Sequence, residues 1–364
     1  MKIGTITFHY AYNYGSALQA YALKRKLELL GHDVSVINYI YEMDKKRYNL
    51  FRFNQYSKPY KILVDLISLP NTINRKNNYL KFQKQFLKIS DCEILTDDEL
   101  TKISENFNCV ICGSDQIWNA ECTKKVVPAY FLNFVKNPNI LKMSYAPSIA
   151  HDSIPDEYIF DFKLFLSNLD AISVREETGK KILENLTDKK ITKVLDPTLL
   201  LELEEYINLE KKVNIDGKYL VLYTLERNKT IFEYAKKIAE QNNIKVVYFN
   251  RFNINEFKNG INMFKYGPCE FLNLIHNAEY VITNSFHATI FSILYGKKFT
   301  TFLTSKSGSR MNDFLTNLGL QDRIYSDNHD ISQDIDYKQA NLHLNEERKK
   351  SLEYLELSLN MKEV

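Results

Sequence analysis

The sequence predicts an α/β protein built from two doubly wound domains. Three observations lead to this prediction: the length of 364 residues, short apolar runs that alternate with helical patterns, and a restart of this alternation after Gly217. A chain of this length exceeds the usual size of one domain, so two domains of similar size are expected. Alternating strands and helices are typical of a parallel sheet covered by helices.

The first half opens with a βαβ pattern. The apolar run KIGTITF is followed by the loop HYAYNYG and by a helix expected over 16–30, with Gly31 in the position of a C-cap. The run VSVINY at 34–39 completes the unit, which should cross over with a right hand. Further strands, separated by helical patterns, are expected near 107–112, 141–146, 171–175 and 192–196.

The second half repeats the pattern after a polar linker near 201–218. In chain order we expect the strand YLVLYTL, a helix near 230–241, the strand KVVYFN, a helix near 270–277, the strand YVITNS, a helix from Phe286 and the strand FTTFL. A final helix, NEERKKSLEYLELSLNM, is expected to fold back on the first half. The expected domains are therefore 1–205 and 215–343, followed by the C-terminal helix within 344–364.

Composition excludes several classes of protein. With 45% hydrophobic and 26% charged residues, the chain is an ordinary globular protein. The net charge of +3, from 48 basic and 45 acidic residues, is too balanced for nucleic acid as the main partner. Five scattered cysteines form no disulfide framework, and neither a signal peptide nor a membrane-spanning run is evident. We expect a cytoplasmic protein.

The stretch 44–88 differs in character from the rest of the first domain. It holds eleven Lys and Arg against two Asp, interleaved with Tyr and Phe, and is expected to be a helical insertion. Basic and aromatic side chains together suit an anionic glycan or a membrane surface. Helices whose rings pack inward and whose lysines are solvated are the favoured interpretation.

Ligands of doubly wound sheets bind beyond the carboxyl ends of the strands, so the loops there are the candidate sites. The loop CGSDQIWN follows an apolar strand and offers Gly113 for close backbone approach. Ser114, Asp115 and Gln116 can hydrogen-bond sugar hydroxyls, although a structural turn with an Asx cap would use the same residues. The CxxC spacing that ends at Cys112 lies along a buried strand and indicates core packing.

Two further loops carry groups that suit an anion. Arg175 ends the strand of SVREE, where its guanidinium can clamp a carboxylate or phosphate, or can pair with a neighbouring glutamate. His287 stands at a predicted helix N-terminus, beside Asn284 and Ser285, where the helix dipole attracts anions and would favour a protonated imidazole. A capping or packing histidine is the alternative.

A third loop, TSKSGSR, adds two cations, Lys306 and Arg310, which can close over an anion or can be solvated. Cations drawn from both halves predict one anion site. The NYGS turn near Asn13 lacks the lysine of a P-loop and the GxGxxG pattern of a dinucleotide site. Neither a metal-ligand cluster nor a serine nucleophile elbow is evident in the sequence.

Seven motifs, spread over about residues 1 to 325, closely resemble the polysaccharide pyruvyl transferase family. They are NYGSALQAYAL, CGSDQIWN, SYAPSIA, SVREETG, VLDPTLLL, TNSFHATIFSILYGKKF and SGSRMNDFLTNLGL. The resemblance implies two Rossmann-like halves in a GT-B-like arrangement with an interdomain cleft. It also implies phosphoenolpyruvate as the donor substrate, with no metal or other cofactor.

The resemblance further implies roles for the candidate residues. His287 and Arg175 are the expected catalytic residues. Arg175 matches the donor-binding arginine, and His287 matches a helix-start histidine, to which we assign the role of general acid or phosphate ligand. Two features differ from the sequences of some relatives. One is the sequence SKSGSR, and the other is the presence of Asn284 and Ser285 where some relatives have an arginine. Contacts with the donor are expected from Asn284, Ser285, Lys306 and Arg310. Contacts with the acceptor are expected from Asn13, Gly15, Ser16, Gly113, Ser114, Asp115 and Gln116. Among these, Asp115 is the expected base.

The implied reaction transfers the pyruvyl group to two hydroxyls of one sugar, which makes a cyclic ketal. The implied acceptor is a sugar, glycan or lipid-linked oligosaccharide of a cell-surface polysaccharide or exopolysaccharide, met at the inner face of the membrane. Peripheral membrane contact would come through the acceptor lipid or the insertion at 44–88. A GT-B glycosyltransferase that uses a sugar nucleotide, and a non-catalytic partner in glycan assembly, are the alternatives.

Overall fold

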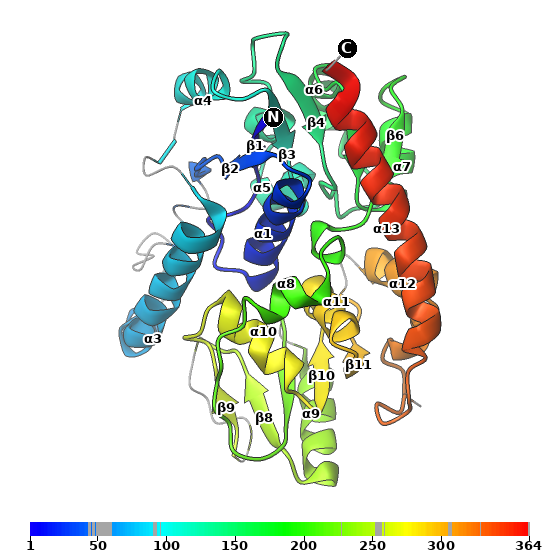
Figure 1. Ribbon diagram of the computed structural model, residues 1–364. Helices are drawn as coiled ribbons and strands as arrows, with labels where there is room; N and C mark the ends of the chain where they lie inside the picture. Colours follow the sequence, from blue (N-terminus) through cyan, green and yellow to red (C-terminus); the bar gives the residue numbers. More distant parts are fainter. Residues whose placement is uncertain are drawn as a thin grey trace. The chain divides into compact units, whose positions relative to one another are not determined.

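The computed structural model (Figure 1) describes residues 1–42, 45, 48, 60–89, 93–94, 96–226, 228–251, 257, 259–304, 308–327 and 329–362. The chain forms two compact units. Unit 1 comprises Met1–Lys46, Gln83–Leu201 and Leu344–Val364, and unit 2 comprises Arg47–Phe82 and Glu202–His343.

Unit 1 contains a parallel sheet with the strand order β2-β1-β3-β4. Its strands are β1 (Lys2–Ile6), β2 (Asp33–Val36), β3 (Cys109–Cys112) and β4 (Leu141–Ser144). A second parallel pair, β5 (Ile172–Val174) and β6 (Ile191–Lys193), is linked to β4 by a bridge between Met143 and Ala171. All four residues of β3 are buried, as expected for a parallel strand covered on both faces.

Most helices of unit 1 lie between these strands in the sequence. The α-helices are α1 (Tyr14–Leu29), α4 (Asp97–Ser104), α5 (Ala120–Thr123), α6 (Asp156–Leu166) and α7 (Glu177–Glu184). The shorter helical turns are η2 (Gln83–Leu87), η3 (Gln116–Trp118), η4 (Pro128–Phe131), η5 (Pro197–Leu199) and η7 (Asn360–Lys362). Helix α1 begins two residues earlier than the predicted Ser16, because the Asn13 side chain accepts the Gly15 N–H at 2.9 Å and caps the helix.

Unit 2 contains a parallel sheet with the order β11-β10-β7-β8-β9. Its strands are β7 (Tyr219–Tyr223), β8 (Lys245–Tyr248), β9 (Ile261–Asn262), β10 (Tyr280–Thr283) and β11 (Lys298–Thr301). Its helices are α3 (Tyr60–Phe82), α8 (Leu203–Ile207), α9 (Lys229–Asn242), α10 (Pro268–His276), α11 (Phe286–Leu294), α12 (Gly308–Asn317) and the turn η6 (Gln321–Arg323). Strand β9 was not predicted, because two residues carry no periodic pattern.

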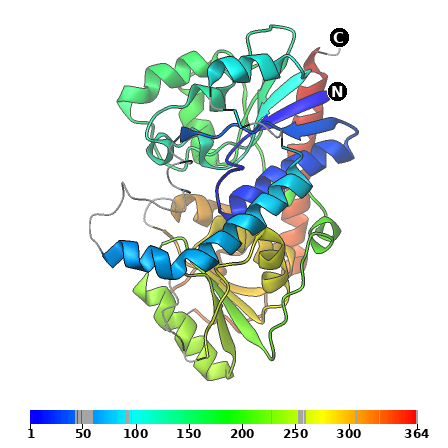
Figure 2. The ribbon, with the colours of Figure 1, turned by 90° about the vertical axis from the view of Figure 1, so that its left-hand side faces the viewer.

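Helix α3 comes from the stretch 44–88, which the sequence assigned to the first domain. In the structure α3 groups with unit 2 and lies beside α10 (Figure 2). The Arg75 guanidinium lies 4.7 Å from the ring centre of Phe264 and donates to the Phe264 carbonyl at 2.9 Å. Tyr79 and Phe82 are buried, so these rings pack inward, whereas Phe51, Phe53 and Tyr56 lie outside the described residues.

The C-terminal helix α13 (Tyr337–Leu359) contributes to both units, and its second half packs on unit 1. Tyr354, Leu355 and Leu359 are buried among the apolar side chains of β1, β3 and β4. The Tyr354 hydroxyl also donates to the Ser144 carbonyl at 2.9 Å. These contacts place α13 against the sheet of unit 1.

The structure bears on the predicted fold class, on the CxxC pair and on membrane-spanning helices. The predicted α/β class with parallel sheets is confirmed. Core packing of the CxxC pair is also confirmed, since Cys109 and Cys112 are free, buried thiols and burial raises the pKa of both. None of the helices in the described part of the chain has the length and apolar character that a bilayer crossing needs.

Candidate functional site

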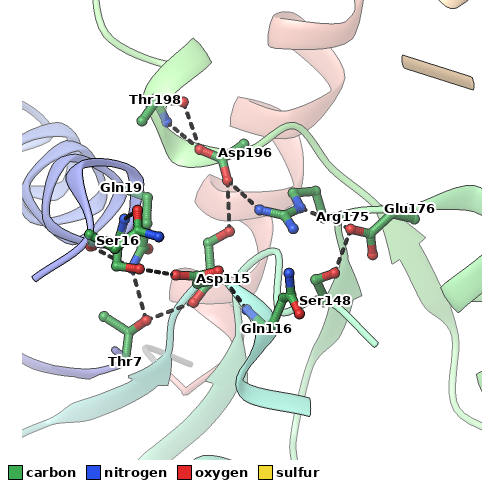
Figure 3. Close-up of polar contacts among 12 residues, drawn as sticks. Thr7, Ser16, Gln19, Asp115, Gln116, Ser148, Arg175, Glu176, Asp196 and Thr198 are labelled. Atoms are coloured by element: carbon green, nitrogen blue, oxygen red, sulfur yellow. Dashed lines mark hydrogen bonds and ion pairs between the residues drawn. The ribbon is translucent and has the colours of Figure 1, made fainter. Parts of the chain in front are cut away.

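Polar side chains gather in unit 1 where its parallel strands end (Figure 3). They come from the loops that follow β1, β3, β4, β5 and β6, and from the first turns of α1. We call this set the polar network; its members are Thr7, Ser16, Gln19, Ser114, Asp115, Ser148, Arg175, Glu176, Asp196 and Thr198. The sequence predicted Ser16, Ser114, Asp115 and Arg175 among them.

Arg175 is the cation of the polar network, and carboxylates hold it on two sides. Its Nε lies 2.9 Å from Glu176 Oε1, and its Nη1 lies 2.9 Å from Asp196 Oδ2. Its side chain is only 3% exposed. Burial alone would lower the pKa of Arg175, but the charges of Glu176 and Asp196 outweigh it and raise the pKa above its ordinary value. The ion pair that the sequence left open as an alternative is therefore present.

The two carboxylates are themselves held by hydroxyl groups. Ser148 Oγ donates to Glu176 Oε1 at 2.6 Å, and Ser114 Oγ donates to Asp196 Oδ2 at 2.9 Å. Each carboxylate therefore accepts from a hydroxyl as well as from the guanidinium. A buried charge is tolerated when it has an opposite charge and hydrogen bonds, and both conditions are met here. Arg175 thus ties the loop after β5 to the loops after β3, β4 and β6.

Asp115 combines an unusual backbone with an accessible carboxylate. Its φ of +76° and ψ of −177° lie in a region that is nearly restricted to glycine. The carboxylate accepts the Gln116 N–H at 2.8 Å and the Ser16 hydroxyl, and the side chain is half-buried. A non-glycine residue held in this conformation points to a role for its side chain.

Gly113 allows close packing of strand ends inside unit 1. A Cβ on Gly113 would come within 3.3 Å of the Thr7 side chain, so the missing side chain lets the β3 end approach the β1 end. Thr7 Oγ1 then donates to the Ser114 carbonyl at 2.6 Å, and Gln19 Nε2 donates to Thr7 Oγ1 at 3.0 Å.

Five members of the polar network were not predicted from the sequence: Thr7, Gln19, Ser148, Asp196 and Thr198. The signal for the last three was present, because SYAPS and LDPT lie at or just after the ends of β4 and β6. The signal for Gln19 was absent from the sequence, since this residue lies within a helix.

In unit 2, the candidate residues gather at the start of α11. Ser285 caps the helix through the Ala288 N–H at 3.5 Å. The Asn284 side chain accepts the Leu225 N–H at 2.8 Å and donates to the Glu226 carbonyl at 3.1 Å, so it links the ends of β10 and β7. Both polar groups of Asn284 thus bind backbone in this conformation.

His287 and Arg310 lie around one ring at the start of α11. The His287 ring stands edge-on to the Phe286 ring, with centroids 5.6 Å apart, and the Arg310 guanidinium lies 5.2 Å from the Phe286 centroid. His287 is 8% exposed. Lys306, the other cation of the predicted donor set, lies outside the described residues.

The structure therefore groups the predicted residues by unit. Ser16, Gly113, Ser114, Asp115, Gln116 and Arg175 belong to the neighbourhood of the polar network, whereas Asn284, Ser285, His287 and Arg310 belong to the start of α11. Asn13 and Gly15 form the N-cap of α1. In the described residues, no group of three or more His, Cys, Asp or Glu side chains is arranged to hold a metal ion.

Comparison with known proteins bears on what these residues serve. A family model described as polysaccharide pyruvyl transferase matches residues 13–306 of the chain. No curated protein sequence gives a significant match. The matched interval includes the polar network apart from Thr7, and the start of α11.

Solved structures show a likeness in fold. The UDP-GlcNAc 2-epimerase from Methanocaldococcus jannaschii has 16% identity and a TM-score of 0.53, over 100% of this chain and 94% of that chain. A provisionally assigned UDP-N-acetylglucosamine 2-epimerase from Listeria monocytogenes has 12% identity and a TM-score of 0.53, over 96% and 90% of the two chains. These likenesses support the predicted fold class of Rossmann-like units, and at this identity they bear on fold alone.

Proposed function

The chain belongs to the polysaccharide pyruvyl transferase family, and we propose that it transfers the pyruvyl group of phosphoenolpyruvate to two hydroxyls of one sugar, as a cyclic ketal. The acceptor is a sugar, a glycan or a lipid-linked oligosaccharide on the way to a cell-surface polysaccharide or exopolysaccharide. The observation that carries the proposal is the start of α11, where a helix N-terminus, an imidazole and a guanidinium lie around Phe286.

The donor has two acidic groups, a carboxylate and a phosphate. The N-terminus of α11 supplies backbone N–H groups and the positive end of the helix dipole, which favour an anion. Arg310 adds a planar guanidinium suited to either acidic group, and we assign Lys306 to the same task. Asn284 and Ser285 shape this turn, and their described bonds favour support of the donor site over direct contact.

The reaction begins with a proton added to the methylene carbon of phosphoenolpyruvate, which leaves an oxocarbenium-like centre at the adjacent carbon. His287 is the proposed general acid or phosphate ligand, because it stands in the first turn of α11. One sugar hydroxyl then bonds to that centre and loses its proton to a base. A second hydroxyl displaces phosphate from the same carbon and loses its proton, so that the products are the ketal and inorganic phosphate.

Asp115 is the proposed base for the acceptor. Its carboxylate is half-buried, and its backbone conformation is one that the fold holds at a cost. Ser16 and the Gln116 N–H orient the carboxylate from one side. Gln116 and Ser16 are further candidates for hydroxyl binding at this place.

Arg175 takes a positioning role in this proposal. Its place at a strand end and the family resemblance both suggested a donor contact, but a contact through Nε or Nη1 would require Glu176 or Asp196 to release it. Since Ser114 and Ser148 also bind these carboxylates, release would disturb the support of Asp115. The paired arrangement favours Arg175 as the residue that fixes the loops around Asp115.

The proposal is tested by phosphate release from phosphoenolpyruvate, measured with and without a panel of free, nucleotide-linked and lipid-linked sugars. Release should depend on an acceptor and should fall by a factor of about 10² or more in His287→Ala, because general acid catalysis contributes about that much. His343→Gln is the matched control, since this half-exposed histidine of α13 hydrogen-bonds Gln339. Acceptor-dependent release at the unmodified rate in His287→Ala would refute the role of His287, and transfer of a hexose from a sugar nucleotide would replace the proposal with glycosyl transfer.

A further inference from the structure

A hollow opens on unit 1 beside the polar network. It has a volume of about 120 Å³, roughly ten times the space that one water molecule needs. Its lining comes from η3, α5, the loop after β4 and α6, and includes Trp118, Glu121, Ile149, His151, Asp152 and Phe162.

The lining has an apolar part and a polar part. Trp118, Ile149 and Phe162, each at most 3% exposed, supply the apolar part. The indole of Trp118 is fixed, because it stacks on Phe131 at 4.8 Å and donates from Nε1 to the Tyr130 carbonyl at 2.9 Å. A pyranose has matching chemistry, with C–H groups on one face and hydroxyls around its edge, and ligand pockets combine an apolar wall with a few polar groups.

The polar part favours some sugars over others by charge. Glu121 and Asp152 bring carboxylates, and His151 Nε2 lies 3.4 Å from Glu121 Oε2. The Glu121 side chain is 52% exposed and that of His151 is 24% exposed. Two carboxylates against one imidazole oppose a phosphate or a uronic acid, whereas hydroxyls and an ammonium group can be hydrogen-bonded.

The hollow is built from the same two loops that hold Asp115. Trp118 belongs to the turn that starts directly after Asp115, and Ile149 follows Ser148, whose N–H donates to the Asp115 carbonyl at 2.8 Å. Ala150, with a left-handed φ of +59°, then turns the chain between Ile149 and His151, which both line the hollow.

We propose that the hollow binds one sugar unit of the acceptor, and that it selects a neutral or amino-bearing unit against an anionic one. The inference rests on the proposed function, because it gives that reaction the chemical class of its acceptor. Glu121 and Asp152 are the specificity-determining residues, and the apolar wall receives the C–H face of the ring.

The experiment measures binding without turnover. Trp118 is the only tryptophan of the chain, so its fluorescence reports on the hollow, and saturation-transfer NMR detects binding that leaves the emission unchanged. The probes are methyl glycosides of glucose, galactose, mannose and glucosamine, with methyl glucuronide as the anionic comparison. The variants are Glu121→Gln and Asp152→Asn. The control is Glu184→Gln, which removes an exposed carboxylate of α7 in the same unit.

At least one neutral or amino glycoside should bind, and the glucuronide should bind about tenfold more weakly or not at all. Each variant should weaken binding of the amino glycoside by about tenfold, as expected for loss of a hydrogen bond to a charged group. Each should also reduce the difference in affinity between the amino glycoside and the glucuronide. The control Glu184→Gln should leave both the affinity for the amino glycoside and this difference unchanged. Absence of glycoside binding by both methods, preferred binding of the glucuronide, or variants that bind like the unmodified protein would overturn the proposal.

The two proposals fail separately. Glycoside binding that responds to Glu121→Gln, together with no phosphate release for any acceptor, would retain the hollow and refute pyruvyl transfer. Ketal formation with glycoside binding that is unaffected by either variant would retain pyruvyl transfer and refute the hollow.

Discussion

At the scale of single residues, Arg175 shows how the structure changes the meaning of a sequence motif. A strand-end arginine before a helix looks like an anion clamp, but its partners in the structure are Glu176 and Asp196. Sequence spacing could not reveal Asp196 as a partner, because 21 residues separate the two. The position of Asn284, Ser285 and His287 at the start of α11 was predictable, since they directly follow one apolar strand.

Substitution of Arg175 separates a positioning role from a donor contact. In Arg175→Lys the point charge remains but the two-sided geometry is lost. If Arg175 positions the loops around Asp115, kcat should fall and the KM for the acceptor should rise, while the KM for phosphoenolpyruvate stays within a factor of about two. Steady-state kinetics with each substrate varied in turn gives this split. A rise confined to the KM for phosphoenolpyruvate would assign Arg175 to the donor.

Asp115 makes a second prediction at this scale. Asp115→Gly relieves a conformation that costs about 1 to 3 kcal/mol, while it removes the bonds to Ser16 and the Gln116 N–H, so the thermal midpoint should change little. Turnover should nevertheless fall by a factor of about 10² to 10⁴, as expected when a general base is lost. Asp115→Asn keeps the shape and should lose turnover similarly. Full activity in either variant would remove Asp115 from the reaction.

At the scale of elements, local signals set most boundaries. Asn13, Ser285 and Asn228 each cap a helix that the sequence predicted, at or within two residues of its expected start. Strand β9 and the grouping of α3 with unit 2 were not predictable, because both depend on tertiary contacts such as that of Arg75 with Phe264. Helix α13 was expected to return to the first half, and its apolar residues pack there.

The packing of α13 gives a matched pair of variants. Leu355 is 0% exposed and Leu357 is 65% exposed on the same helix. Leu355→Ala should lower the free energy of unfolding by about 2 to 5 kcal/mol, because it leaves a cavity in the core of unit 1. Leu357→Ala, with the same chemical change on the surface, should stay within about 0.5 kcal/mol. Denaturant unfolding followed by circular dichroism measures both, and equal losses would contradict the packing described for α13.

At the scale of the whole molecule, composition and alternation were enough to predict the α/β class and its parallel sheets. The polar network needed the structure, because five strand ends contribute to it from separate parts of the chain. The family match over residues 13–306 then gives the chain its class of chemistry, which fold alone could not supply.

Each unit also contains a histidine whose lowered pKa should make stability depend on pH: His9 is buried and His329 is half-buried. Burial lowers the pKa of His9 in unit 1, and burial with the charge of Arg323 lowers the pKa of His329 in unit 2. Both side chains therefore bind a proton more readily when unfolded. Stability should be full above the ordinary histidine pKa of about 6.5 and should fall below it, by up to about 1.4 kcal/mol per pH unit for each histidine.

Unfolding free energies measured from pH about 7.5 to about 5.5 check this dependence. His9→Gln and His329→Gln should each flatten the decline, because each removes one group that gains a proton on unfolding. A decline of equal slope in the unmodified protein and in both variants would show that other groups cause it.

In the proposed reaction a pyruvyl group moves from phosphoenolpyruvate to a sugar as a ketal. The most direct measurement is the NMR spectrum of the product formed in D₂O, because mass alone does not separate a ketal from an enolpyruvyl ether. We expect a ketal methyl group that carries one deuterium, taken up when the methylene carbon is protonated. A vinyl methylene in the product, or an added hexose with phosphoenolpyruvate unchanged, would contradict it.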